Sequence, residues 1–258
     1  MSFAFATRAE LLKTKRTASV WLTVLGAGFI PAMLLAAYLV KPEGSIQQMQ
    51  QNPWGIHFKF GWNALSFFLF PMYIILISSL IPQIEYKNNT WKQVFAAPQS
   101  VGIIFFSKFV TIQLMLVLFF LLYNFFMIGA GVVANIIHPK YTFLHHAIGW
   151  RPLLQLNAKT FIATLGISAI QYVISLRFKN FIAPIGIGLA LLVGSLIAMQ
   201  VGWKHMYKLP YMHPALTLQS LTMPNRPALE NHEWNAMICC ALFLLLGFLD
   251  LRFRSEKG

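Results

Sequence analysis

Long apolar stretches separated by short polar segments dominate the chain. A helix that crosses a membrane needs roughly 20 apolar residues, because each residue adds about 1.5 Å of rise. Six stretches reach this length, the fourth and sixth only when their apolar flanks are included. We expect spans at residues 20–40, 62–84, 109–133, 155–176, 181–201 and 234–251. The pattern predicts an all-α integral membrane protein with a bundle of about six transmembrane helices.

Composition agrees with this interpretation. Hydrophobic residues make up 57% of the chain and charged residues only 10%, which is far more apolar than a water-soluble domain. We expect one membrane domain over residues 1–258 and no soluble domain. The formal charge of +13 does not indicate nucleic acid, because the basic residues lie in short segments between apolar stretches. We expect them to contact anionic membrane lipid.

The positions of Lys and Arg predict the orientation. Twelve of the 20 lie in the N-terminal segment, the second and fourth connections and the C-terminal tail. The other eight are spread over three longer connections. Because cytoplasmic segments carry the excess of basic residues, we expect both termini in the cytoplasm. The chain is predicted to be a multi-pass protein of the cell (inner or plasma) membrane.

Functional chemistry is sparse in the predicted spans. Ionisable residues are absent from the middle of the spans, where proton-coupled transporters and intramembrane hydrolases carry them. No glycine-rich phosphate loop of the Walker type occurs, so ATP cannot bind this chain in that way. Cys239 and Cys240 are adjacent in the last span and fit a role as small apolar side chains. We expect no catalytic residue, no metal ligand and no directly bound cofactor.

One stretch after the second span has the pattern of a short amphipathic helix. Thr90 can cap its start, Trp91, Val94 and Phe95 share one helical face, and Pro98 ends it. Such a helix could lie across the cytoplasmic end of the bundle, or it could simply rest on lipid.

Three places in the chain resemble the membrane subunits of type-2 ABC exporters, particularly the lantibiotic-immunity and bacitracin-export permeases. The first is the basic lead 10–17 into the Trp21-containing span. The second is Glu85 through Thr90-Trp91-Lys92, followed by Pro98-Gln99-Ser100 and Ser107-Lys108. The third is Gln171-Tyr172 with Ser175 to Phe181 and Pro184. One departure is Asn88-Asn89, which stands where many relatives have a glycine.

The resemblance implies a permease that borrows its energy from a separate ABC ATPase subunit, which would bind the ATP and Mg²⁺. The segment from Glu85 to Phe95 would be a cytoplasmic coupling helix, with contacts to the ATPase through Glu85, Asn89, Thr90, Trp91, Lys92, Val94 and Phe95. An N-terminal amphipathic elbow helix would lie on the inner leaflet and carry Glu10, Lys13, Lys15 and Arg16. A second permease, identical or a sister subunit, would complete the exporter. Its cargo would be amphipathic or peptide-like, such as an antimicrobial peptide.

Two other functions remain open from the sequence. A membrane-embedded lipid-modifying enzyme could use His145, His146, Glu230 and Glu233, provided that the outer connections bring them together. A scaffold or sensor-associated membrane protein would need no site. An ATP-hydrolysing partner that co-purifies with the chain would favour the exporter, whereas activity of the chain alone would favour the enzyme.

Overall fold

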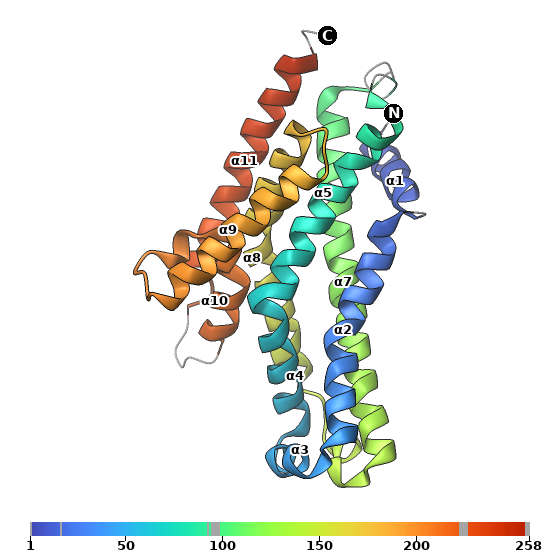
Figure 1. The fold of residues 1–258 in the computed structure, drawn as a ribbon, viewed down its shortest axis with the longest axis vertical. Helices are drawn as coiled ribbons and strands as arrows, with labels where there is room; N and C mark the ends of the chain where they lie inside the picture. Colours follow the sequence, from blue (N-terminus) through green and yellow to red (C-terminus); the bar gives the residue numbers. More distant parts are fainter. Residues whose placement is uncertain (1, 16, 92, 94–98, 222–226, 256–258) are drawn as a thin grey trace.

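The chain forms an elongated bundle of helices in a computed structural model (Figure 1). The structure describes residues 2–15, 17–91, 93, 99–221 and 227–255. Among these residues it has no strand. The α-helices are α1 (Phe3–Thr14), α2 (Ala18–Val40), α3 (Pro42–Met49), α4 (Pro53–Ala64), α5 (Phe70–Asn88), α7 (Val101–Ile137), α8 (Trp150–Arg177), α9 (Ile182–Gln200), α10 (His213–Ser220) and α11 (Asn231–Ser255). A π-helical turn, η1 (Leu65–Leu69), joins α4 to α5, and 3-10 turns η2 (Pro139–Tyr141), η3 (Phe143–His145), η4 (Met206–Lys208) and η5 (Pro210–Met212) lie in the connections.

The prediction of an all-α membrane protein with six spans is confirmed. Within the described residues, six helices are long and apolar enough to cross a membrane. Several extend beyond the predicted spans, because a helix does not have to end where the hydrocarbon ends. Helix α7 has 37 residues, or about 55 Å at the usual rise, and begins where the Ser100 side chain accepts a hydrogen bond from the Ile103 N–H.

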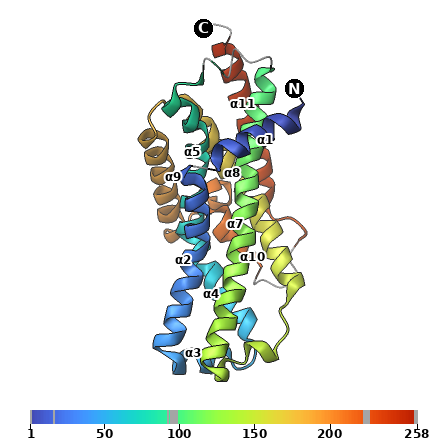
Figure 2. The same cartoon turned by 90° about the vertical axis from the view of Figure 1, so that its right-hand side faces the viewer.

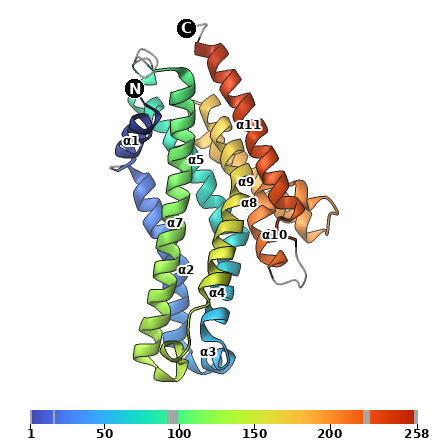
Figure 3. The same ribbon diagram turned by 180° about the vertical axis from the view of Figure 1, so that it is seen from behind.

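Several connections meet at one end of the bundle. Figure 1 shows both termini there, together with the described residues of the α5–α7 connection (89–91, 93, 99 and 100) and the turn between α8 and α9, while α3 lies at the opposite end. Helix α1 crosses α7 at a steep angle near this end (Figure 2). Seen from behind, α10 lies beside the N-terminal end of α11, partway along the bundle (Figure 3).

Small and polar side chains hold the apolar middle of the bundle together. Gly188 of α9 lies so close to its neighbours that an added Cβ would be 2.6 Å from Gln171 Oε1 and 2.8 Å from Ile75 Cγ2. The Gln171 amide donates to Ser79 Oγ at 3.1 Å and to the Pro184 carbonyl at 2.6 Å. Such contacts replace the hydrophobic effect, which does not drive helix association in lipid. Gly188 therefore joins α9 closely to α5 and α8.

We expect Gly188→Val to loosen α9, because the new side chain must displace Gln171 and Ile75; overpacking of this kind costs about 1–3 kcal/mol. The matched control is Gly186→Val in the same helix, where an added Cβ meets nothing within 4 Å. Thermal unfolding of the purified protein in detergent measures both. Equal unfolding temperatures for the two variants would contradict the packing role.

Candidate functional site

The α5–α7 connection begins with a sharp break in the backbone. Asn89 has a left-handed φ of 52°, its N–H bonds to the Tyr86 carbonyl at 3.3 Å, and the Thr90 N–H bonds to the Glu85 carbonyl at 3.0 Å. This pair of bonds is the Schellman motif, which ends a helix. The prediction of one helix from Glu85 to Phe95 is therefore wrong: Glu85 belongs to the last turn of α5.

Asn89 explains why the sequence misleads here. A left-handed residue favours glycine, and asparagine is one of the few other residues that adopt this conformation readily. Beyond the break, Trp91 and Gln93 are helical. The other predicted coupling residues, Lys92, Val94 and Phe95, lie outside the described residues.

Four charged side chains form a closed ring between α1, α5 and α7. Lys13 Nζ lies 2.6 Å from Glu10 Oε1 and 2.9 Å from Glu85 Oε1. Lys108 Nζ lies 2.6 Å from Glu10 Oε2 and 2.6 Å from Glu85 Oε1. Each cation thus contacts both carboxylates, and the formal charges cancel. We call Glu10, Lys13, Glu85 and Lys108 the charge ring.

Most of the charge ring is out of contact with water. The side chains of Glu85 and Lys108 are each 1% exposed, and that of Glu10 is 9% exposed. Moving an ion into such a place costs several kcal/mol, which only close pairing offsets. Removing any member therefore leaves an uncompensated buried charge. The ring ties three elements that are far apart in the sequence into a single unit.

This pairing shifts the pKa values of Glu10 and Lys13, the two members of the charge ring that lie in α1. Burial alone would raise the pKa of Glu10, but Lys108 and then Lys13 outweigh it, so this pKa lies below its ordinary value. Burial would lower the pKa of Lys13, but Glu10 and Glu85 outweigh it, so this pKa is raised. The stabilisation by Glu10 is lost as the pH falls through its lowered pKa, and that by Lys13 as the pH rises through its raised pKa. Both groups therefore stay charged at neutral pH.

Helix α1 depends on the charge ring for its attachment to the bundle. Its buried residues are small or polar, namely Ala6, Thr7, Glu10 and Thr14. Its large apolar side chains Phe3, Phe5 and Leu12 are instead exposed, as expected for a helix that rests on lipid. Of the other predicted elbow residues, Lys15 is exposed and Arg16 lies outside the described residues.

Trp91 packs against the charge ring. Lys108 Nζ lies 5.7 Å from the centre of the Trp91 indole, within the range of a cation–π contact. The Tyr86 phenol lies 5.3 Å from the indole, centre to centre, and its hydroxyl donates to the Leu176 carbonyl at 2.7 Å. Gln83 donates to the Phe178 carbonyl at 2.8 Å. The end of α5 is thus bound to the α8–α9 turn as well as to α1 and α7.

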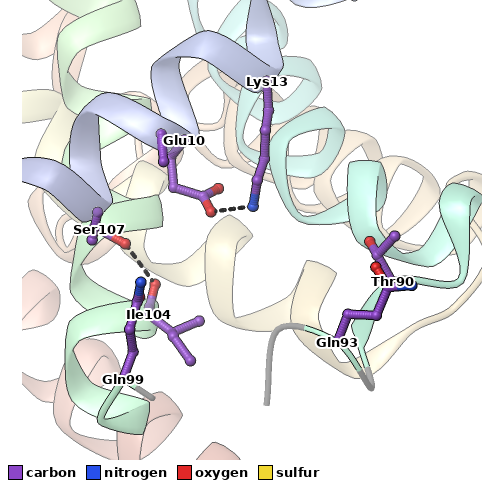
Figure 4. A pocket seen from close by; sticks show the side chains of 9 residues that line it. Glu10, Lys13, Thr90, Gln93, Gln99, Ile104 and Ser107 are labelled. Atoms are coloured by element: carbon purple, nitrogen blue, oxygen red, sulfur yellow. Dashed lines mark hydrogen bonds and ion pairs between the residues drawn. The ribbon is translucent and has the colours of Figure 1, made fainter. Parts of the chain in front are cut away.

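A hollow of about 300 Å³ opens beside the charge ring (Figure 4). It lies between α1, the α5–α7 connection and the start of α7. Its lining consists of Ala6, Ala9, Glu10, Lys13, Thr90, Gln93, Gln99, Ile104 and Ser107. Glu10 and Lys13 thus lie both in the ring and on the wall of a space at the end of the bundle.

The structure also places the residues of the proposed lipid-modifying enzyme. His145 and His146 are exposed, and the His146 carbonyl accepts a hydrogen bond from Trp54 Nε1 at the start of α4. Glu233 is buried and paired with Lys159. Among the described residues, no recorded contact joins the histidines to Glu230 or Glu233, and no group of three metal-binding side chains occurs. Nothing in the described contacts favours the enzyme.

Sequence reasoning identified Glu10, Lys13, Glu85 and Trp91 but not how they meet. It treated Lys108 only as part of a family-like pattern before the third span, one residue outside the predicted boundary. One signal in the sequence could have identified Lys108. The residues around it from Phe105 to Val110 are nearly all apolar, and a lysine without an acidic partner is costly in such surroundings.

A family model described as "ABC-2 family transporter protein" matches residues 6–195, which is well over half of the chain and includes the whole charge ring. The search of curated proteins found no match.

We expect Lys108→Met to destabilise the protein by about 3–5 kcal/mol, because it leaves two buried carboxylates with one cation. The double variant Lys108→Met/Glu10→Gln restores the charge balance and should recover much of this loss. Thermal unfolding in detergent measures both variants.

The control is Arg177→Met. It removes an ion pair in which the Arg177 guanidinium lies 2.7 Å from an Asp250 carboxylate oxygen and the arginine side chain is 60% exposed. Exposed ion pairs of this kind contribute about 0–1 kcal/mol. If Lys108→Met were no more harmful than Arg177→Met, the charge ring would not hold the site together.

Proposed function

The chain belongs to the ABC-2 family of transporter proteins, and we propose that it is the permease subunit of an ATP-driven exporter of the lantibiotic-immunity and bacitracin-export type. With six helices able to span a membrane among its described residues, it is a transmembrane subunit of an ABC transporter. The proposal adds the direction of transport, the ATPase partner and the class of cargo.

The observation that carries the proposal is the charge ring beside the α5–α7 connection. Energy from a separate subunit must enter through an element that is both exposed at the end of the bundle and rigidly joined to the spans. The α5–α7 connection meets both conditions, because Gln93 is exposed while Trp91 packs on Lys108 of the ring.

An ABC ATPase subunit would dock on this end of the bundle. The sequence lacks a Walker-type phosphate loop, so ATP and Mg²⁺ would be bound by the partner. When the ATPase pair closes on ATP, it would push the α5–α7 connection. The displacement would pass from Trp91 to Lys108 in α7 and, through the charge ring, to Glu85 in α5 and Glu10 in α1. The helices would then shift between two packed states, one open to each side.

Two permeases, two copies or a copy and a sister subunit, would form the substrate route between their bundles. Charged side chains are absent from the middle of the spans. A route built from such helices suits an amphipathic or peptide-like cargo, including antimicrobial peptides. The end of the bundle with the two termini would face the cytoplasm of a cell whose inner or plasma membrane holds the complex.

We expect Trp91→Ala to lower permease-stimulated ATP hydrolysis about tenfold, because the variant removes the contact between the α5–α7 connection and Lys108; buried aromatic contacts often contribute 2 kcal/mol or more. The assay uses the complex purified through a tag on this chain with the ATPase that accompanies it. The control is Trp203→Ala, which changes an exposed tryptophan in the α9–α10 connection. Equal hydrolysis by both variants would contradict the coupling role, and the absence of any ATPase partner would contradict the proposed function.

Labelling tests the orientation. In a chain with Cys239 and Cys240 changed to serine, we expect Lys87→Cys to react with an impermeant maleimide only after the cells are opened. Lys204→Cys, at the start of the α9–α10 connection, should react in intact cells. Both lysines are exposed, so access to the reagent decides the result. The reverse pattern would contradict the assignment of the cytoplasmic end.

A further inference from the structure

Two buried polar side chains of α10 form hydrogen bonds to other elements, His213 to the Tyr207 carbonyl and Thr217 to His232. Helix α10 packs on α8 and α11 and also touches α4, η1 and η5, and it lies against the long helices in Figure 3. Its buried residues are His213, Pro214, Ala215, Thr217, Leu218 and Ser220. Only one of them has a large aliphatic side chain. The state of the buried polar groups therefore affects how firmly α10 is docked.

His213, the first residue of α10, has one ring nitrogen in use. Its Nε2 lies 2.9 Å from the Tyr207 carbonyl. Because a carbonyl only accepts, Nε2 carries the hydrogen, and the neutral imidazole keeps its lone pair on Nδ1. His213 is 0% exposed, and Nδ1 is buried without a hydrogen-bond partner. When α10 is docked, the basic nitrogen Nδ1 is therefore buried without a partner. A proton bound there would form a second N–H that has no hydrogen-bond acceptor.

The neighbouring ionisable groups would not compensate a charge on His213. From α11, the His232 imidazole lies 6.0 Å away, centre to centre, and its Nε2 is 2.9 Å from Thr217 Oγ1 of α10. Next to it, Glu233 is paired with Lys159 of α8 at 3.2 Å, and the same Glu233 oxygen accepts from the Glu230 N–H at 2.8 Å.

The remaining elements supply no free acid. From η4, Tyr207 contributes its carbonyl, and from η5 the Tyr211 hydroxyl is bonded to Gln171 at 3.1 Å. In α4, His57 is bound between the Tyr38 hydroxyl and the Met127 carbonyl, and Lys59 is exposed. The turn η1 has no titratable side chain. Among the described neighbours, the closest carboxylate in the network is Glu233; its Oε2 is paired with Lys159, while its Oε1 is buried without a hydrogen-bond partner, and no contact joins either oxygen to His213.

We propose that His213 is a proton-binding site that controls the docking of α10: the neutral imidazole keeps the helix docked, and protonation releases it. A proton on Nδ1 creates a buried cation with an N–H that lacks an acceptor, and undocking relieves both. This inference concerns α10 alone and does not depend on the ATPase partner or on the orientation.

The pKa of His213 agrees in direction with this geometry. Burial and, to a smaller extent, the nearby His232 lower the pKa of His213 to about 4, against the opposing effect of the Tyr207 carbonyl. A lowered histidine pKa means that docking is fully stable above the ordinary value of about 6.5 and is progressively lost as the pH falls toward the pKa of the docked state. Between pH 7 and pH 5 this linkage predicts that the docking equilibrium weakens about twentyfold.

Hydrogen–deuterium exchange of the full-length protein in detergent tests the proposal. Peptides from α10 are compared at pH 7 and pH 5 after correction for the intrinsic pH dependence of exchange. We expect α10 protection to fall about twentyfold at pH 5, while protection in the middle of α7 stays constant. His213→Gln, whose amide can still donate to the Tyr207 carbonyl but cannot be protonated, should show no fall. His205→Gln, at an exposed histidine in the same connection, should behave like the unmodified chain.

Constant α10 protection in the unmodified chain between pH 7 and pH 5 would overturn the proposal. The same loss of α10 protection in His213→Gln as in the unmodified chain would also overturn it. A loss of protection that is absent only from His232→Gln would overturn it as well, because the proton would then bind to His232. If His213→Gln does not fold, the ¹⁵N resonances of the labelled imidazoles in the unmodified protein decide. A His213 midpoint well below 6.5 that coincides with the loss of α10 protection supports the proposal, and a midpoint at or above 6.5 overturns it.

Discussion

The pairing of four charges, three of them buried, is the constraint on which the end of this bundle depends. Glu85 and Lys108 are almost completely buried, and only close pairing with opposite charge offsets the cost of burying each of them. The members come from α1, α5 and α7. If these helices moved apart, charged side chains would be left unpaired in apolar surroundings, so the helices keep their relative positions. A helix with few large apolar contacts of its own, α1, is thereby fixed to two long spans.

Charge is arranged differently along the rest of the molecule. The middle of the bundle relies on close contacts such as Gly188 against Gln171 and on hydroxyl and amide hydrogen bonds. A second buried ion pair, Lys159 with Glu233, joins α8 to α11 beside α10. Ionic joints thus lie at two levels, with close glycine contacts and neutral hydrogen bonds between them. Because buried ion pairs resist separation, we expect each joint to move as a unit.

The sequence was sufficient for the helical class and the six spans, because apolar length alone determines both. It was insufficient for the site. The contact of Lys108 with Glu10 joins residues 98 positions apart, and no local pattern encodes such a pairing. The break at Asn89 was not predicted, although Asn88-Asn89 was noted to stand where many relatives have a glycine, because the resemblance implied one helix from Glu85 to Phe95; asparagine can take the left-handed conformation of glycine. Helix α10 went unrecognised since its Pro-rich surroundings are typical of irregular connections.

Coupling through the charge ring requires α1 and the end of α5 to move together. Pulsed electron paramagnetic resonance between spin labels at Arg8→Cys and Lys87→Cys, both exposed positions, measures this directly in a chain with Cys239 and Cys240 changed to serine. With the ATPase bound, we expect one narrow distance distribution that is the same with and without ATP. A distribution that shifts or broadens on addition of ATP would contradict it.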